Sequence, residues 1–260
     1  MNTLEYFKEQ FDQIQSGDRD SNLLTIRQNA FENFRKMGIP TVKHEEWKYT
    51  RIGGLFNKEY QFAVNQPAAS LSPEDLDAVR LPGHEQANEL IFINGIFSFP
   101  FSKIRSANQF IVLPLEEAAK NEYKDVVSKH FGHSGNYLKD GINALNTAFM
   151  QGAVFIQVKK GQVPEHPIYI YNITDARSVN IFSQPRSLVH IGENAQVQLV
   201  ETYTTIGLEE SFTNQVMEII VEKDALLEYY KIQNDADHTN QVCTTHIRQT
   251  GKSYIHTVTV

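Results

Sequence analysis

The chain of 260 residues contains a single cysteine, Cys243, so it cannot form a disulfide within itself. It also has no run approaching the roughly 18 consecutive apolar residues that a membrane-spanning helix needs. After Met1 come Asn, Thr, Leu and Glu, rather than the basic residues and apolar stretch of a secretion signal. These absences predict a soluble, cytoplasmic protein that contacts no membrane.

Positive charge is also scarce. The chain has 24 Lys and Arg residues against 31 Asp and Glu residues, and a formal net charge of -7. Nucleic acids bind to clusters of basic side chains, which neutralise their phosphates, so the composition argues against a nucleic-acid partner. Hydrophobic residues make up 41% of the chain, which is enough to form the core of one large domain or two smaller ones.

The first 60 residues carry a helical pattern. Apolar residues recur at a spacing of three or four positions in two segments, separated by a Gly-Asp break at 17–18. The two sets are Leu4, Phe7, Phe11 and Ile14, then Leu23, Ile26, Ala30 and Met37. This pattern predicts a small helical unit over residues 1–60.

Residues 61–150 show mixed signals. Asn94-Gly95 lies between apolar runs at 89–93 and 96–99, which is the strongest short-range indication of a β-hairpin. A short strand is predicted at 111–113, and helices are predicted over 115–130 and 142–150. We therefore expect a mixed α/β region.

From residue 151 onward, apolar and polar residues alternate and the segments repeat. Residues 187–199 align with 216–229, so that Ala195 is followed by Ala225 after 30 residues, and Ser253 follows after 28 more. Short strands repeating at this period are typical of a β-solenoid, in which each turn buries its apolar face only against its neighbours. The pattern therefore predicts a mainly β fold with a solenoid core over 151–260.

The alignment also predicts which side chains stack. Two apolar columns are expected inside the solenoid: Val189, Ile219 and Ile247, and Val197, Leu227 and Ile255. One polar column is expected outside: Gln198, Glu228 and His256.

The segment 38–50 combines the only Trp with Gly-x-Pro and a charged turn. Gly38 is predicted to end the preceding helix in a left-handed conformation, and Pro40 prevents its continuation. We expect Trp47 and Tyr49 to fix the turn onto the body of the protein. The six positions that define the motif are all interpreted as structural: Gly38, Pro40, Glu45, Trp47, Tyr49 and Thr50.

The string Gly-Ile-Pro-Thr-Val-Lys-His-Glu-Glu-Trp-Lys-Tyr-Thr over 38–50 resembles a segment near the N-terminus of the SufD branch of the SufB/SufD family. The segments 141–148 and 186–195 are also similar to that family, so the resemblance covers most of the chain. It implies a right-handed β-helix core, in agreement with the repeat. It further implies a non-catalytic scaffold subunit of the Suf iron-sulfur cluster assembly complex, with SufB and the SufC ATPase as partners.

The resemblance has a limit at the C-terminal end. The chain ends within an alternating segment, 254–260, whereas the resemblance implies further turns and a C-terminal helical domain. We expect an N-terminal portion that lacks the SufC-binding region, and a homodimer when the chain is alone. The resemblance also implies that any iron or iron-sulfur cluster is held at the interface with SufB, with no cofactor or metal bound by this chain alone.

Cys243 and His246 are the candidate metal ligands within the solenoid. Strand parity puts Cys243 and Ile247 on the buried face and His246 on the opposite face. A cysteine packed in an apolar interior is the favoured interpretation, since such surroundings suppress thiol reactivity. The alternative is a locally polar interior in which Cys243 passes sulfur or holds iron. One cysteine cannot hold a conventional cluster alone.

Three rival functions remain at this point. His130 and His133 flank the end of a predicted helix and could approach one metal ion, as in a metalloenzyme. A SufB-like paralogue is the nearest alternative within the family, although more cysteines would be expected of it. A carbohydrate-active β-helix enzyme would need clustered carboxylates on one face, and the sequence offers no such cluster.

Overall fold

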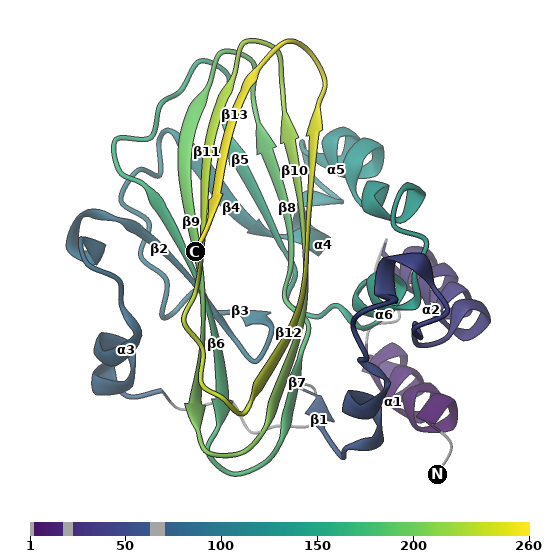
Figure 1. Cartoon of the computed structure of the whole chain (residues 1–260). Helices are drawn as coiled ribbons and strands as arrows, with labels where there is room; N and C mark the ends of the chain where they lie inside the picture. The colour runs from purple at the N-terminus through teal and green to yellow at the C-terminus, as the bar shows by residue number, and fades with distance from the viewer. Residues whose placement is uncertain (1–2, 18–22, 63–70) are drawn as a thin grey trace.

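The computed structural model describes residues 3–17, 23–62 and 71–260, and over these residues the chain forms a β-solenoid of about four turns. Two sheets of mostly parallel strands face each other. Helices α1, α2, α5 and α6 lie outside the sheet that contains β10 and β12, and α3 lies outside the other sheet (Figure 1). The predicted mainly β solenoid, preceded by a helical and mixed region, is confirmed.

Within the described residues, the first sheet has seven strands and the second has six. The first contains β1 (Gln61–Phe62), β4 (Phe110–Pro114), β5 (Val154–Val158), β7 (Ile181–Ser183), β8 (Arg186–Ile191), β10 (Ser211–Val221) and β12 (Thr239–Gln249). The second contains β2 (Asn88–Ile93), β3 (Ile96–Phe97), β6 (Ile168–Ala176), β9 (Gln196–Gly207), β11 (Leu226–Gln233) and β13 (Tyr254–Thr259). Each turn of the solenoid contributes neighbouring parallel strands to both sheets.

The register confirms the predicted columns. In the first sheet Ile219 pairs with Val189 on one side and with Ile247 on the other, and in the second sheet Leu227 pairs likewise with Val197 and Ile255. These residues pack in one apolar cluster inside the solenoid. The outward column is also present, with the Gln198 amide donating a hydrogen bond to Glu228 at 3.4 Å.

Tight corners join β8 to β9 and β10 to β11. Asn194 and Asp224 occupy equivalent corner positions, both at φ 58°. Asn and Asp tolerate this left-handed conformation better than other residues with a side chain. On the opposite side of the solenoid, β9 and β11 lead into β10 and β12 through connections at 208–210 and 234–238.

The predicted N-terminal helices are α1 (Thr3–Gly17) and α2 (Leu24–Met37), followed by the short 3-10 helices η1 (Glu45–Trp47) and η2 (Gly53–Asn57). Together with α6 (Gly141–Phe149), they pack against the outer face of the first sheet. The contact is mainly aromatic. Phe182 of β7 stacks on Phe212 of β10 at 4.7 Å, and both pack with the rings of the helices.

Residues 71–150 supply the remaining helices and part of the sheets. The helical segments are α3 (Pro73–Val79), η4 (His84–Gln86), α4 (Leu115–Ala118), α5 (Lys124–His130) and η5 (His133–Asn136). Strand β2 pairs with β6, and β4 pairs with β5, so this region extends both sheets of the solenoid. The division of the chain at residues 61 and 151 stays a prediction.

The Trp47 motif agrees only in part with its predicted structure. Gly38 has a positive φ of 68°, but its ψ of -168° lies outside the left-handed helical region, so the predicted cap conformation is wrong. Pro40 is buried, and Trp47 packs partly buried against the aromatic cluster of the N-terminal helices. Tyr49 is 90% exposed, with Lys48 beside its ring, so the prediction that it fixes the turn is wrong.

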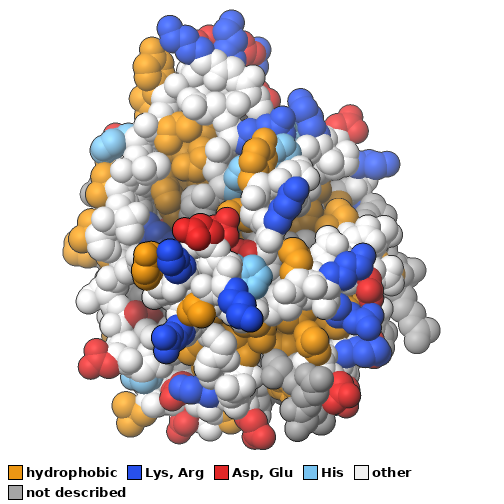
Figure 2. Space-filling view, turned by 45° about the vertical axis from the view of Figure 1, so that its right-hand side comes forward, with side chains coloured by type: hydrophobic (Ala, Val, Ile, Leu, Met, Phe, Trp, Pro, Cys, Tyr) orange, Lys and Arg blue, Asp and Glu red, His pale blue; other side chains and the backbone are white. Residues whose placement is uncertain are grey.

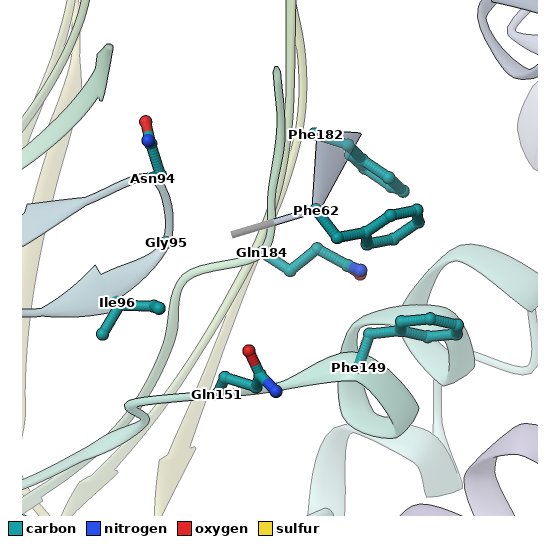
Figure 3. A pocket seen from close by; sticks show the side chains of 8 residues that line it. All are labelled: Phe62, Asn94, Gly95, Ile96, Phe149, Gln151, Phe182 and Gln184. Atoms are coloured by element: carbon teal, nitrogen blue, oxygen red, sulfur yellow. The ribbon is translucent and has the colours of Figure 1, made fainter. Parts of the chain in front are cut away.

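The predicted hairpin is formed by β2 and β3, with Asn94 and Gly95 in its turn at φ 51° and 85°. Figure 3 shows how closely this turn approaches the segment that follows β7, beside a small cavity that Phe62 and Phe149 also line. A Cβ atom on Gly95 would lie 2.5 Å from the backbone nitrogen of Gln184. Glycine at this position is therefore required by both conformation and space.

We expect Gly95→Ala to lower the free energy of unfolding by about 1–3 kcal/mol more than Gly161→Ala, the cost of forcing extra volume into a packed site. Gly161 is the matched control because it also has a positive φ, of 70°, while a Cβ atom added there would meet no neighbouring atom within 4 Å. Urea unfolding of both variants measures the difference. Equal destabilisation would show that the turn moves away without cost.

Candidate functional site

The interior of the solenoid changes from apolar to polar along its strands. In β9 the inward positions run from Val197 and Leu199 to Glu201 and Tyr203, and in β11 they run from Leu227 to Lys231. The polar positions are adjacent in the register, because Glu201 pairs with Lys231. The polar part of the interior therefore spans several turns.

A buried carboxylate lies at the centre of this region. Glu201 is 1% exposed and accepts hydrogen bonds from the Tyr229 hydroxyl at 2.5 Å and from the Asn172 amide at 3.2 Å. The Tyr229 hydroxyl is also 3.3 Å from the Thr245 hydroxyl of β12. Buried charges are costly without such partners, so this network holds the side chains of four strands in place.

Cys243 lies beside this network on the inward face of β12. Its thiol is 3.6 Å from the Gln241 side-chain oxygen and contacts Tyr203 and Lys231. Burial raises the pKa of the Cys243 thiol, and Glu201 adds to that effect, while Lys231 opposes it. Strand parity predicted the inward orientation correctly. The predicted apolar surroundings are wrong, because polar side chains line this part of the interior.

The single thiol of the chain permits a direct test of this environment. With its raised pKa, Cys243 is expected to react slowly with a thiol reagent at neutral pH and faster as the pH rises, because the thiolate is the reactive form. An aromatic disulfide reagent forms a mixed disulfide with Cys243 and releases a coloured thiolate, and the rate of that release in the native state and in denaturant measures the protection. Modification at equal rates in both conditions would contradict the assigned environment.

Gln215 adds unused hydrogen-bonding capacity to the same interior. It pairs with Cys243 across β10 and β12 and is 2% exposed. Both polar atoms of its side-chain amide are buried without a hydrogen-bond partner among the described residues. Each such atom lowers the stability of the folded state by about 1–3 kcal/mol unless water or another polar group forms a hydrogen bond with it. The solenoid interior beside Cys243 thus contains polar atoms with unused hydrogen-bonding capacity.

His246 points away from the solenoid interior, as strand parity predicted, and meets His133 outside the first sheet. The two rings stack with centroids 5.5 Å apart, and Nδ1 of His133 is 3.4 Å from Nε2 of His246. Burial lowers the pKa of His246, and the nearby Glu218 partly offsets this effect. Cys243 and His246 therefore lie on opposite faces of β12 and do not pair, as strand parity predicted.

His130 has a different neighbour, the ring of His190 at 6.1 Å. Burial lowers the pKa of His130 to about 4, with Lys129 contributing in the same direction, so its ring is neutral at pH 7. Among the described residues, no group of three or more His, Cys, Asp or Glu side chains is arranged to hold a metal ion. The ring contacts of these two residues are with other histidines: His130 lies beside His190, and His133 lies beside His246.

Sequence reasoning missed Glu201, Lys231 and the partnership of His133 with His246. A signal for the first two was present in the repeat. Glu201 and Lys231 are 30 residues apart and share the parity of Val197 and Leu227, so both were predictable as inward charged residues. No comparable signal existed for His133, because it lies outside the repeating strands.

These features define a β-solenoid protein with parallel turns, a half-polar interior and a helical layer on one sheet. The family model described as "SufBD protein N-terminal region" matches residues 2–170. The family model described as "SUF system FeS cluster assembly, SufBD core domain" matches residues 172–260. The chain belongs to the SufBD family.

Curated relatives agree with this assignment. The chain is 27% identical over 244 residues to an iron-sulfur cluster assembly SufBD family protein of Synechocystis, covering 90% of this chain and 52% of the relative. It is 27% identical over 221 residues to SufD of Escherichia coli, covering 81% and 47%. It is 31% identical over 137 residues to SufB of Bacillus subtilis, covering 52% and 29%. The chain thus spans about half the length of the first two relatives.

Family membership also resolves one of the rival interpretations. The carbohydrate-active β-helix enzyme shared the expected architecture, but the matched families are those of iron-sulfur cluster assembly. Among the described residues, none of the helices is both long and apolar enough to span a membrane.

Proposed function

We propose that this protein is a SufD-like, non-catalytic scaffold subunit of the cytoplasmic Suf machinery, where it pairs with SufB and works with the SufC ATPase. The observation that carries the proposal is the extent of similarity. The match to SufD of Escherichia coli covers 81% of the chain, whereas the match to SufB of Bacillus subtilis covers 52%. The single cysteine agrees with the SufD side of the family.

The strand arrangement supports a scaffold role. Among the described residues, β12 pairs only with β10 and β13 pairs only with β11. Each strand therefore leaves one edge of backbone N–H and C=O groups available for hydrogen bonding. Such edges accept a further strand, either from the same subunit or from a partner, by extension of the sheet. A heterodimer with SufB built in this way would place iron or a cluster at a shared surface.

Co-purification distinguishes the two branches of the family. The chain is co-expressed separately with tagged SufB and with tagged SufD from the same organism. Retention by SufB alone is the expected result. Retention by SufD alone would instead identify a SufB-like paralogue, and retention by neither would remove the support for a scaffold role in residues 1–260.

SufC serves as an internal comparison in the same experiment. The resemblance assigns SufC binding to a region that follows the solenoid core in family members. We therefore expect SufC to be retained through SufB rather than by residues 1–260 directly. Capture of SufC by this chain without SufB would contradict that arrangement.

A further inference from the structure

His133 and His246 are 113 residues apart in the sequence but face each other outside the first sheet. Nδ1 of His133 lies 3.4 Å from Nε2 of His246, and the ring planes are inclined by 30°. Tyr137 stacks on the His246 ring at 5.1 Å and lies 5.3 Å from the His133 ring. Both histidines are only partly buried.

A single buried carboxylate positions both rings. The backbone N–H groups of Gly132 and Ser134, on either side of His133, donate to Glu218 at 2.9 and 2.6 Å. Glu218 is also the residue of β10 that pairs with His246 of β12. Arg186 fixes the carboxylate at 2.7 Å. The two histidines are therefore held in place by contacts that their own rings do not provide.

The distance between the two nitrogen atoms is informative. A direct N–H hydrogen bond usually spans about 2.7–3.2 Å, so 3.4 Å is long for one. Two nitrogen ligands that each lie about 2.0–2.1 Å from a tetrahedral zinc ion are separated by roughly 3.3–3.4 Å. The observed spacing thus fits a pair of nitrogen ligands to one metal ion, as well as a long hydrogen bond between the two imidazoles.

We propose that His133 and His246 bind a divalent first-row transition-metal ion such as Zn²⁺ or Co²⁺, through Nδ1 and Nε2 respectively. Neutral imidazole nitrogen is a suitable ligand for such ions. Since no third His, Cys, Asp or Glu joins the pair in the described part of the chain, water or an incoming donor occupies the remaining positions. The site therefore holds an exchangeable ion rather than a structural one, and it is independent of the proposed SufB partnership.

Calorimetric titration of the tag-free chain with Zn²⁺, and separately with Co²⁺, tests the site. One equivalent is expected to bind. His133→Ala and His246→Ala are each expected to weaken binding at least about tenfold, since even the loss of a residue that supports a metal ligand costs 10–100-fold. His256→Ala is the matched control, because His256 is an exposed histidine on β13 in the other sheet.

Thermal unfolding provides a second readout. An ion that binds only the folded state raises the melting temperature, so Zn²⁺ should stabilise the unmodified chain and the His256 variant but not the other two. All four proteins should unfold at similar temperatures in a chelator, which shows that the variants fold. The proposal is overturned if no ion binds, or if His256→Ala weakens binding as much as His133→Ala and His246→Ala.

Discussion

Replacing Glu218 by Ala is expected to lower the free energy of unfolding by about 3–5 kcal/mol, because it leaves a buried guanidinium without its counter-charge. Arg186 is fully buried and Glu218 is 1% exposed, with their charged groups 2.7 Å apart. The same change removes the acceptor of the N–H groups of Gly132 and Ser134. Urea unfolding followed by circular dichroism measures the loss.

Two further variants identify the cause of this effect. Glu209→Ala removes an exposed carboxylate and should leave the stability nearly unchanged. The double variant Arg186→Met with Glu218→Ala removes both charges and should recover part of the loss. A Glu218→Ala variant as stable as the Glu209→Ala variant would show that the ion pair does not hold this part of the fold.

The same carboxylate gives the stability a pH dependence. Burial alone would raise the pKa of Glu218, but Arg186 and the N–H groups of Gly132 and Ser134 lower it overall, below the ordinary value of 4.5. The stabilisation is therefore complete above pH 4.5 and is lost as the pH falls through the lower pKa of the folded state. Glu218→Gln should thus lose stability relative to the unmodified chain at pH 7, and the difference should shrink in acid. A difference that is constant with pH would contradict this assignment.

Phe212→Ala is expected to lower the free energy of unfolding by about 3–5 kcal/mol, the usual range for removing a buried aromatic side chain. Phe212 is 1% exposed on the outer face of β10, where it stacks on Phe182 at 4.7 Å and meets Phe56 edge-on at 5.5 Å. The substitution leaves a cavity where the N-terminal helices meet the solenoid. Denaturant unfolding measures the global effect, and limited proteolysis shows whether the helical layer is released first.

Tyr49→Ala is the control for this substitution. Tyr49 is also aromatic and belongs to the N-terminal region, but it is 90% exposed, so its removal should hardly change the stability. In the space-filling view, hydrophobic side chains reach the surface at several places between Lys and Arg side chains (Figure 2). Equal effects of the two substitutions would mean that Phe212 does not fasten the helices to the sheet.

The solenoid could be predicted because its structural repeat is visible as a repeat in the amino-acid sequence. A strand has a period of two, so aligning Val189 with Ile219 and Ile247 was enough to decide which side chains point inward. The Asn94-Gly95 turn was predictable for a similar local reason. Both inferences depend on backbone geometry that nearby residues determine.

The character of the interior depends on more than one strand. Parity shows that Cys243 points inward, but it does not show that Glu201 and Lys231 of the facing sheet approach the same space. The partnership of His133 with His246 depends on how a non-repeating segment folds back over β12. The prediction that Tyr49 fixes the turn was wrong for another reason. The sequence motif is local, but the exposure of its side chains depends on how the rest of the protein packs against it.

The two sides of the solenoid differ in how strictly they fix the length of the chain. Between equivalent inward residues, the tight corner always takes eight positions: 189 to 197, 219 to 227, and 247 to 255. The opposite side takes 22 positions from 197 to 219, but 20 from 227 to 247. Between register-matched positions, residues 204–210 of one turn correspond to residues 234–238 of the next, so the difference in length is absorbed by the end of β9 and the connection that follows it. Relatives can therefore diverge in length on this side while the stacked columns keep their order.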